Sequence, residues 1–131
     1  MQIAATAFDD SSSNSYAGIS DTTSLSFTTA DETAPTFSSA ATNTAGTKVI
    51  LTYNEALSAT TAATSAFAVT TAGVSNSVTA ATVSGSTVEL TLTTTLKNDE
   101  TVTVAYTDPS GSDDANAIQD AAGNDLSLIH I

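Results

Sequence analysis

The stretch TVTVAYT, residues 101–107, decides the fold class of this sequence. Its apolar residues Val102, Val104 and Tyr106 recur at every second position, with threonine or alanine between them. Successive side chains of a β-strand point to opposite faces, and β-branched threonine suits the solvent face of a pleated sheet. The stretch therefore predicts a strand with one buried face and one exposed face.

The same alternation recurs upstream of this stretch. Four further runs show it, with these residues in phase: Val49, Leu51 and Tyr53; Phe67 and Val69; Val78, Ala80 and Thr82; Val88, Leu90 and Leu92. Turn signals rich in Gly, Asn and Ser separate the runs. Short strands at this spacing predict an all-β fold, a β-sandwich. Residues 54–65 are ambiguous, because their alanines allow either one helical turn or a loop that crosses between sheets.

Two segments of the sequence repeat one pattern. Residues 7–14, AFDDSSSN, align without gaps to residues 117–124, AIQDAAGN, which lie 110 positions later. This offset is about the length of one sandwich domain, so it indicates tandem repeats. We therefore expect residues 1–30 to be the C-terminal fragment of a preceding repeat, and residues 31–125 to be nearly all of the next one.

Two features mark the ends of these predicted repeats. In the first, residues 22–29 predict a strand with Leu25 and Phe27 pointing inward, followed by the linker DETAP at 31–35. In the second, the final residues 126–131, LSLIHI, match the in-frame translation of a common transposon-library sequencing adapter. We therefore expect the repeat to end near Asp125 and exclude these six residues from functional reasoning. The alternative is a genuine final strand, because Leu126, Leu128 and Ile129 are apolar.

Six short motifs, in order along the chain, carry a family resemblance. They are DETAPTF at 31–37, KVILTYNEAL at 48–57, SAFAVT at 65–70, VSGSTVELTL at 83–92, ETVTVAYTDPSG at 100–111 and AIQDAAGND at 117–125. In these motifs the sequence resembles bacterial immunoglobulin-like repeats of the SwmB type, found in a cyanobacterial swimming-motility protein and in large surface adhesins. The resemblance implies an immunoglobulin-like β-sandwich with Greek-key connections. It also implies a secreted or cell-surface protein built from tandem repeats, with roles in adhesion, motility or surface structure. The partners it implies are neighbouring repeats of the same chain, with cell-surface glycans or other cells as further candidates.

The charge balance excludes some classes of partner. The sequence has 14 acidic residues against two lysines, for a net charge of -12. A nucleic-acid binder needs a basic face to displace counterions, so nucleic acid is not an expected partner. No stretch reaches the roughly 20 apolar residues of a membrane span, so membrane insertion is not expected either. The absence of cysteine excludes disulfides and thiolate metal sites.

The acidic residues cluster in predicted loops, which indicates a hard cation such as Ca²⁺. Ca²⁺ takes oxygen ligands from carboxylates and carbonyls in flexible loops. We expect an interdomain Ca²⁺ site formed by Asp9, Asp10, Asn14, Asp31, Glu32 and Glu55. A second, half-built copy would consist of Asp108, Asp120, Asn124 and Asp125. The alternative is plain turn chemistry, because Asp and Asn favour turns through hydrogen bonds to their own backbone.

Enzymatic interpretations find few suitable groups. A Ser-His-Asp triad would need His130, the only histidine, which lies in the excluded six residues. The adjacent Asp113 and Asp114 lie in a polar loop, where solvent leaves little difference between their pKa values for acid–base work. We therefore predict no enzyme, but a non-catalytic structural or adhesion repeat with Ca²⁺-rigidified joints. One alternative is a carbohydrate- or ligand-binding module, which would need exposed aromatic residues. Another is a disordered linker, since Val, Ile, Leu and Phe make up only about a fifth of the chain.

Overall fold

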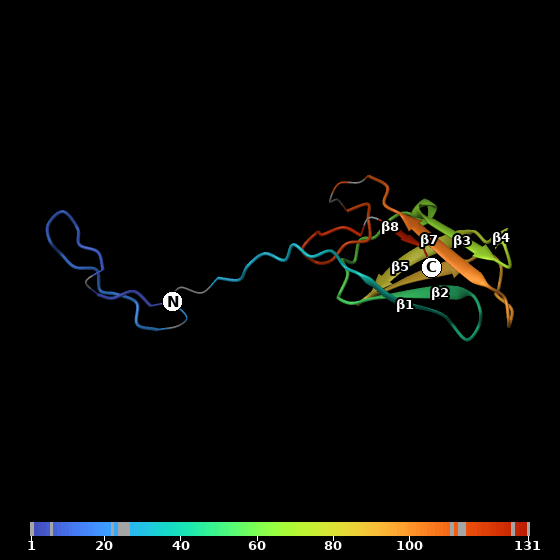
Figure 1. The fold of residues 1–131 in the computed structure, drawn as a ribbon, viewed down its shortest axis with the longest axis horizontal. Coiled ribbons are helices and arrows are strands. Elements are labelled where there is room, and N and C mark those ends of the chain that lie inside the picture. Colours follow the sequence, from blue (N-terminus) through green and yellow to red (C-terminus); the bar gives the residue numbers. More distant parts are fainter. Residues whose placement is uncertain are drawn as a thin grey trace. The chain divides into compact units, whose positions relative to one another are not determined.

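The chain divides into two compact units, Met1–Ala30 and Asp31–Ile131. The computed structural model describes residues 2–5, 7–21, 23, 27–110, 112, 115–126 and 128–130. In the described part of the second unit, the elements are β1 (Phe37–Thr42), β2 (Lys48–Tyr53), the 3₁₀ helix η1 (Thr64–Ala66), β3 (Phe67–Thr71), β4 (Val74–Ser75), β5 (Val78–Ser84), β6 (Thr87–Leu92), β7 (Val102–Thr107) and β8 (Leu128–His130) (Figure 1). The all-β prediction is confirmed for the described residues.

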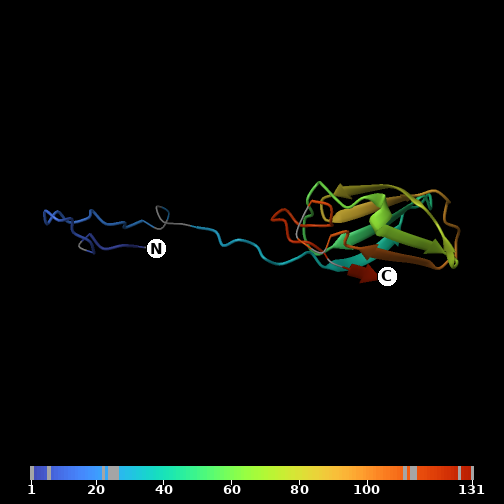
Figure 2. The same cartoon turned by 90° about the horizontal axis from the view of Figure 1, so that it is seen from above.

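The strands of the second unit form two antiparallel sheets. One has the order β1-β2-β6-β5 and the other the order β4-β3-β7-β8. The sheets lie as two facing layers, which Figure 2 shows from above. Residues 54–63 cross from the first sheet to the second and end in η1, so the loop interpretation holds, with one 3₁₀ turn at its end.

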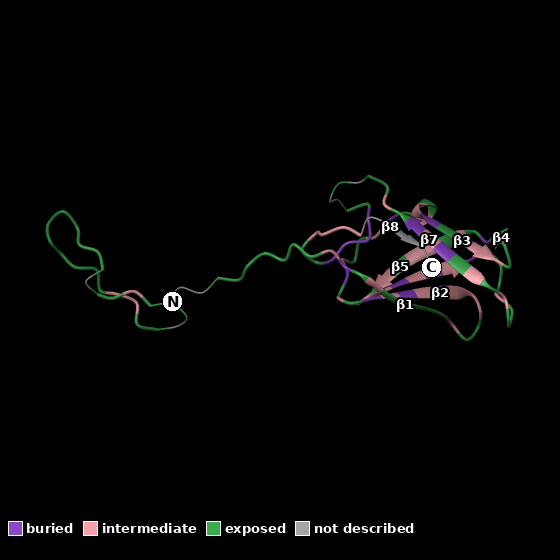
Figure 3. Cartoon of the chain, in the orientation of Figure 1, coloured by how far each residue is buried: buried purple, intermediate pink, exposed green. Residues whose placement is uncertain are grey.

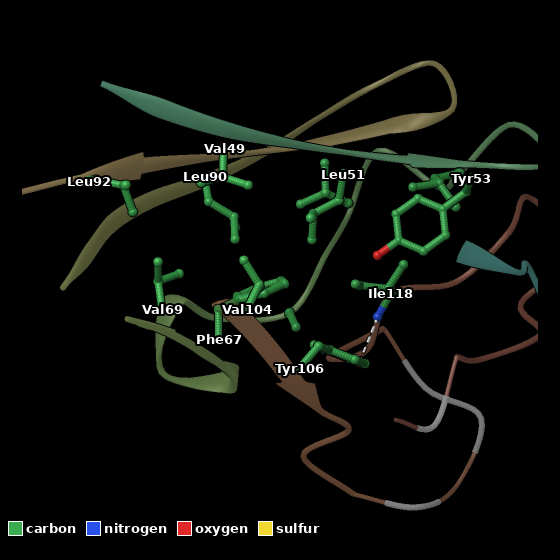
Figure 4. Packing of buried hydrophobic residues seen from close by; sticks show 13 residues of the cluster. Val49, Leu51, Tyr53, Phe67, Val69, Leu90, Leu92, Val104, Tyr106 and Ile118 are labelled. Carbon is green, nitrogen blue, oxygen red and sulfur yellow. Dashed lines mark hydrogen bonds between the residues drawn. The ribbon is translucent and has the colours of Figure 1, made fainter. Parts of the chain in front are cut away.

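The core lies between the sheets and is filled by the side chains that the alternation predicted. Every second residue of β2 and β6 is buried, and the same phase continues on β3 and β7 across the gap (Figures 3 and 4). The shared core side chains are Val49, Leu51, Tyr53, Phe67, Val69, Val88, Leu90, Leu92, Val104 and Tyr106. Burying side chains of this size stabilises the fold by about 1.5–3 kcal/mol each.

The predicted phase of β5 is wrong beyond its first residue. Val78 packs against the core as expected, but Ala81 and Val83 follow it there, while Thr82 is exposed. The pairing with β6 shifts register between Val78 and Ala80. A β-bulge of this kind adds one residue to a strand and turns every later side chain to the other face.

A hairpin from the long connection after β7 closes one end of the core. Ile118 is 1% exposed and belongs to the core cluster. Its N–H donates a buried hydrogen bond of 2.9 Å to Tyr106 Oη, drawn as a dashed line in Figure 4. Leu126 packs against the same cluster and donates its N–H to Ile118 O over 2.8 Å. The residues 118–126, hereafter the second hairpin, are thus anchored at both ends.

The backbone of β8 pairs with β7, Ile129 opposite Tyr106. This is the position that the alternative prediction gave to a final strand. Any extended segment can pair with an open strand edge, so the pairing holds whatever the origin of residues 126–131.

The first unit contains isolated bridges rather than strands in its described residues. Ile3 pairs with Ile19, and Asp9 pairs with Ser15. Of the predicted strand at 22–29, residues 22 and 24–26, including Leu25, lie outside the described residues. Phe27 is 85% exposed. The prediction that it points inward is wrong, because no described residue of this unit pairs with it to form a sheet.

No helix among the described residues is long and apolar enough to cross a membrane.

Two buried tyrosines give a matched test of the anchor. Tyr106→Phe is expected to lower the free energy of unfolding by about 1–3 kcal/mol, because the buried Ile118 N–H loses its acceptor. Tyr53→Phe is the control, since no described group is a hydrogen-bond partner of the buried Tyr53 Oη. Burial, with a smaller contribution from Tyr106, raises the pKa of Tyr53, so its hydroxyl stays protonated. Urea unfolding should show Tyr53→Phe to be neutral or stabilising, and equal losses in the two variants would contradict the anchor.

Candidate functional site

Three carboxylates from distant parts of the second unit meet at one place. One oxygen each of Asp31, Glu55 and Asp120 lies within 4.8 Å of the other two. Asp31 is exposed, Glu55 is half-buried and Asp120 is buried. We call these three residues the carboxylate trio. The trio takes two residues from the first predicted Ca²⁺ site and one from the second.

Contacts between three loops bring the trio together. The loop after β2 pairs with the second hairpin, because Leu57 forms a bridge with Asp120 and the Ser58 N–H donates to Gln119 O over 2.8 Å. The linker joins them through Asn124, whose Nδ2 donates to Asp31 O over 3.1 Å. The linker, the β2–η1 loop and the second hairpin therefore meet at one end of the sandwich.

Asp120 organises the turn of the second hairpin. Its Oδ1 accepts the backbone N–H groups of Ala122, Gly123 and Asn124 at 2.7–2.9 Å, and its Oδ2 accepts Asn124 Nδ2 at 2.8 Å. Burial raises the pKa of Asp120, but these hydrogen bonds together outweigh it and hold the pKa below the ordinary 3.8. The carboxylate is therefore ionised near neutral pH.

Asp10 does the same in the first unit. Its Oδ1 accepts the N–H groups of Ser12 and Asn14, and its Oδ2 accepts Asn14 Nδ2 at 2.9 Å. The Asn14 side chain, followed by the two backbone groups, lowers the pKa of Asp10. The turn chemistry of the alternative interpretation is thus present at both Asp10 and Asp120.

The backbone of residues 8–16, hereafter the first hairpin, shares most of its hydrogen bonds with the second hairpin, but the Ser13 N–H donates to Asp10 O, whereas the Gly123 N–H donates to Asp120 Oδ1. Tyr16 N–H donates to Phe8 O as Leu126 N–H donates to Ile118 O, both over 2.8 Å. The bridge Asp9–Ser15 corresponds to the bridge Gln119–Asp125. The match does not extend beyond the hairpins. Ile19 and Ile129 lie at corresponding positions, but Ile19 pairs with Ile3, whereas Ile129 pairs with Tyr106.

The turn also has the same left-handed residue in both hairpins. Ser13 has φ 64° and Gly123 has φ 96°. This conformation is strained for a residue with a Cβ, which explains why glycine suits the position. Ser13 nevertheless adopts it, so the serine does not change the turn.

The other predicted Ca²⁺ ligands lie outside the trio. Asp108 caps its own turn, its Oδ1 accepting the Ser110 N–H over 3.0 Å. Asp125 is half-buried beside Gln119, and Glu32 is exposed in the linker. Asp9, Asp10 and Asn14 belong to the first unit, so their predicted meeting with the linker acids stays a prediction. Asp113 and Asp114 lie outside the described residues.

Comparison with known families gives one match. The model of the SWM repeat, described as "putative flagellar system-associated repeat", matches residues 30–111. This range covers the linker and strands β1 to β7 and ends before the second hairpin. No curated protein and no solved structure matches the sequence.

The lowered pKa of Asp120 has a consequence for stability against pH. Its stabilisation is present above the unfolded value of 3.8 and is lost as the pH falls through the lower folded value. Asp120→Asn keeps one acceptor but turns an NH₂ group toward Asn124 Nδ2. It should lower the free energy of unfolding at neutral pH by on the order of 1 kcal/mol.

The same variant should also lose stability less steeply than the parent chain as the pH falls below the ordinary pKa of 3.8. Asp108→Asn is the control, because it removes the same charge from a turn in which one described group, the Ser110 N–H, donates to the carboxylate. Urea unfolding at neutral and acid pH measures both effects. If the free energy of unfolding of Asp120→Asn fell with acid pH as steeply as that of the parent chain, the Asp120 carboxylate would not be the source of this pH dependence.

Proposed function

Because this chain belongs to the SWM repeat family, we propose that it is a non-catalytic structural repeat of a bacterial secreted or cell-surface protein, in which Ca²⁺ fixes the linker to the sandwich. The observation that carries the proposal is the carboxylate trio, which joins the linker residue Asp31 to two loops of the sandwich. Such a repeat acts mechanically, since stiff joints between sandwiches let a tandem array extend from the cell.

The topology supports an immunoglobulin-like repeat. The order β1-β2-β6-β5 facing β4-β3-β7 corresponds to the order A-B-E-D facing C′-C-F of immunoglobulin sandwiches. The linker between the two units contains Pro35, which is buried, and proline favours a stiff, extended connection. Both features suit a repeat whose neighbours follow it along one chain.

The charges around the trio favour a bound cation. The one ion pair among the described residues joins Lys48 to Glu89 across β2 and β6, so no ion pair neutralises the trio. Carboxylates at this separation repel each other, and a divalent cation between them would reverse the sign of that interaction. Ca²⁺ accepts carboxylates together with backbone carbonyls, and both groups are present at this end of the sandwich.

The carbohydrate-binding alternative has less support from the sandwich of residues 31–126, although Phe8, Tyr16 and Phe27 of the first unit are exposed. All four aromatic side chains of residues 31–126 are buried or half-buried, namely Phe37, Tyr53, Phe67 and Tyr106. A sugar-binding face would need aromatic rings open to solvent.

Thermal unfolding of the full chain tests the Ca²⁺ proposal. In roughly 10 mM Ca²⁺, above the range of about 10⁻⁴–10⁻³ M at which extracellular Ca²⁺ modules bind, the melting temperature should exceed that in chelator. A stabilisation of about 1 kcal/mol corresponds to a rise of roughly 4–8 °C. Mg²⁺ at the same concentration should give a smaller shift, because it holds its water ligands more strongly.

Two matched variants locate the ion. Glu55→Gln should abolish the Ca²⁺ shift, whereas Glu100→Gln should keep it, because Glu100 precedes β7 and thus lies at the opposite end of that strand from Asp108 and the second hairpin. A melting temperature insensitive to Ca²⁺ would remove the ion from the account. A full shift in Glu55→Gln would place the ion elsewhere.

A further inference from the structure

We propose that the first hairpin, residues 8–16, is the closing element of a second sandwich of the same type, and that Phe8 enters that core as Ile118 enters its own. The partner is thus a sandwich of the same type as that of residues 31–126, but one that has no hairpin of its own at the position of the second hairpin. The inference rests on the proposed function as a tandem repeat, but it uses none of the Ca²⁺ argument.

The matching backbones place different side chains at the same hairpin positions. In the second hairpin these positions hold Ile118, which is 1% exposed, and Leu126, which packs on the core. In the first hairpin they hold Phe8, which is 64% exposed, and Tyr16, which is 39% exposed. The apolar pair at these positions is covered by the core in the second hairpin and is exposed to solvent in the first. This difference indicates that the first hairpin binds a partner that covers Phe8 and Tyr16.

Phe8 and Tyr16 already lie on one face of the first hairpin. Their rings meet edge to face, with centroids 6.4 Å apart and planes at 65°. Aromatic pairs in this arrangement are preorganised, and further apolar burial of both rings would stabilise a complex. The face therefore presents one continuous apolar surface to a partner.

The backbone shows what the partner must supply. Ile118 N–H donates to the buried Tyr106 Oη, which lies on β7 of the sandwich that the second hairpin closes. The Phe8 N–H, at the corresponding position, is not bonded to any described group. A sandwich with a tyrosine at the position of Tyr106 would provide both the acceptor and the apolar pocket, which Figure 4 shows around Ile118 between Tyr53 and Tyr106.

A graft within the full chain tests this inference. Residues 117–126 are replaced by AFDDSSSNSY, the sequence of residues 7–16, so that the first hairpin must close the sandwich present in this chain. The control graft is identical except that it carries Ile118→Ser and Leu126→Ser in place of Ile118→Phe and Leu126→Tyr. All chains are measured in chelator, so that a bound ion cannot contribute.

The expected result is cooperative unfolding of the graft at a melting temperature roughly 10 °C or more above that of the control graft. In addition, the amide proton at position 118 should remain protected from exchange in the graft and lose protection when Tyr106→Phe is added. A graft that melts with its control, or whose amide at 118 exchanges freely, overturns the role of Phe8.

A second graft carries the same replacement of residues 117–126 except that it keeps Ile118. It distinguishes an effect of the larger Phe side chain at position 118 from an effect of the rest of the grafted hairpin. If this graft also melts with the control, the first hairpin cannot close such a sandwich and the whole inference is overturned. Either failure is distinguishable from failure of the proposed Ca²⁺ function, because the parent chain would still show its Ca²⁺ shift.

Discussion

The burial of Ile118 between the two sheets is the interaction on which the rest of the second unit depends. Residues 108–127 form a long connection between β7 and β8, and closing such a loop costs conformational entropy. Ile118 offsets that cost because its side chain is buried in the core and its N–H donates a hydrogen bond to Tyr106 Oη. With this anchor in place, the second hairpin has a fixed position at one end of the sandwich.

The anchor also determines where the charges lie. Asp120 follows Ile118 by two residues, so fixing Ile118 brings the Asp120 carboxylate beside Glu55 and the linker residue Asp31. The same carboxylate holds the turn through four hydrogen bonds, which keep it ionised. Turn formation and cation binding are therefore compatible at this residue, because the turn supplies an acid that is already ordered and charged.

The sequence predicts most of the fold because burial alternates strictly on β2, β3, β6 and β7. It predicts the strand β5 but not the phase of β5 beyond Val78, since a bulge depends on the register with β6 rather than on the strand's own residues. The gapless alignment of residues 7–14 and 117–124 indicates a repeated segment, and both copies form a hairpin with a left-handed residue at the same position, Ser13 and Gly123. The sequence places Asp31 and Glu55 in one predicted site, but it does not predict that Asp120 joins them, because the bridge between Leu57 and Asp120 has no local sequence signal.

Native-state hydrogen exchange at the Ile118 amide is the most direct test of the central claim. If Ile118 anchors the connection after β7, its N–H should exchange only through global unfolding, with the same protection as the core amides of Leu51 and Leu90. Exchange of the Ile118 amide as fast as that of exposed loop amides would contradict the account.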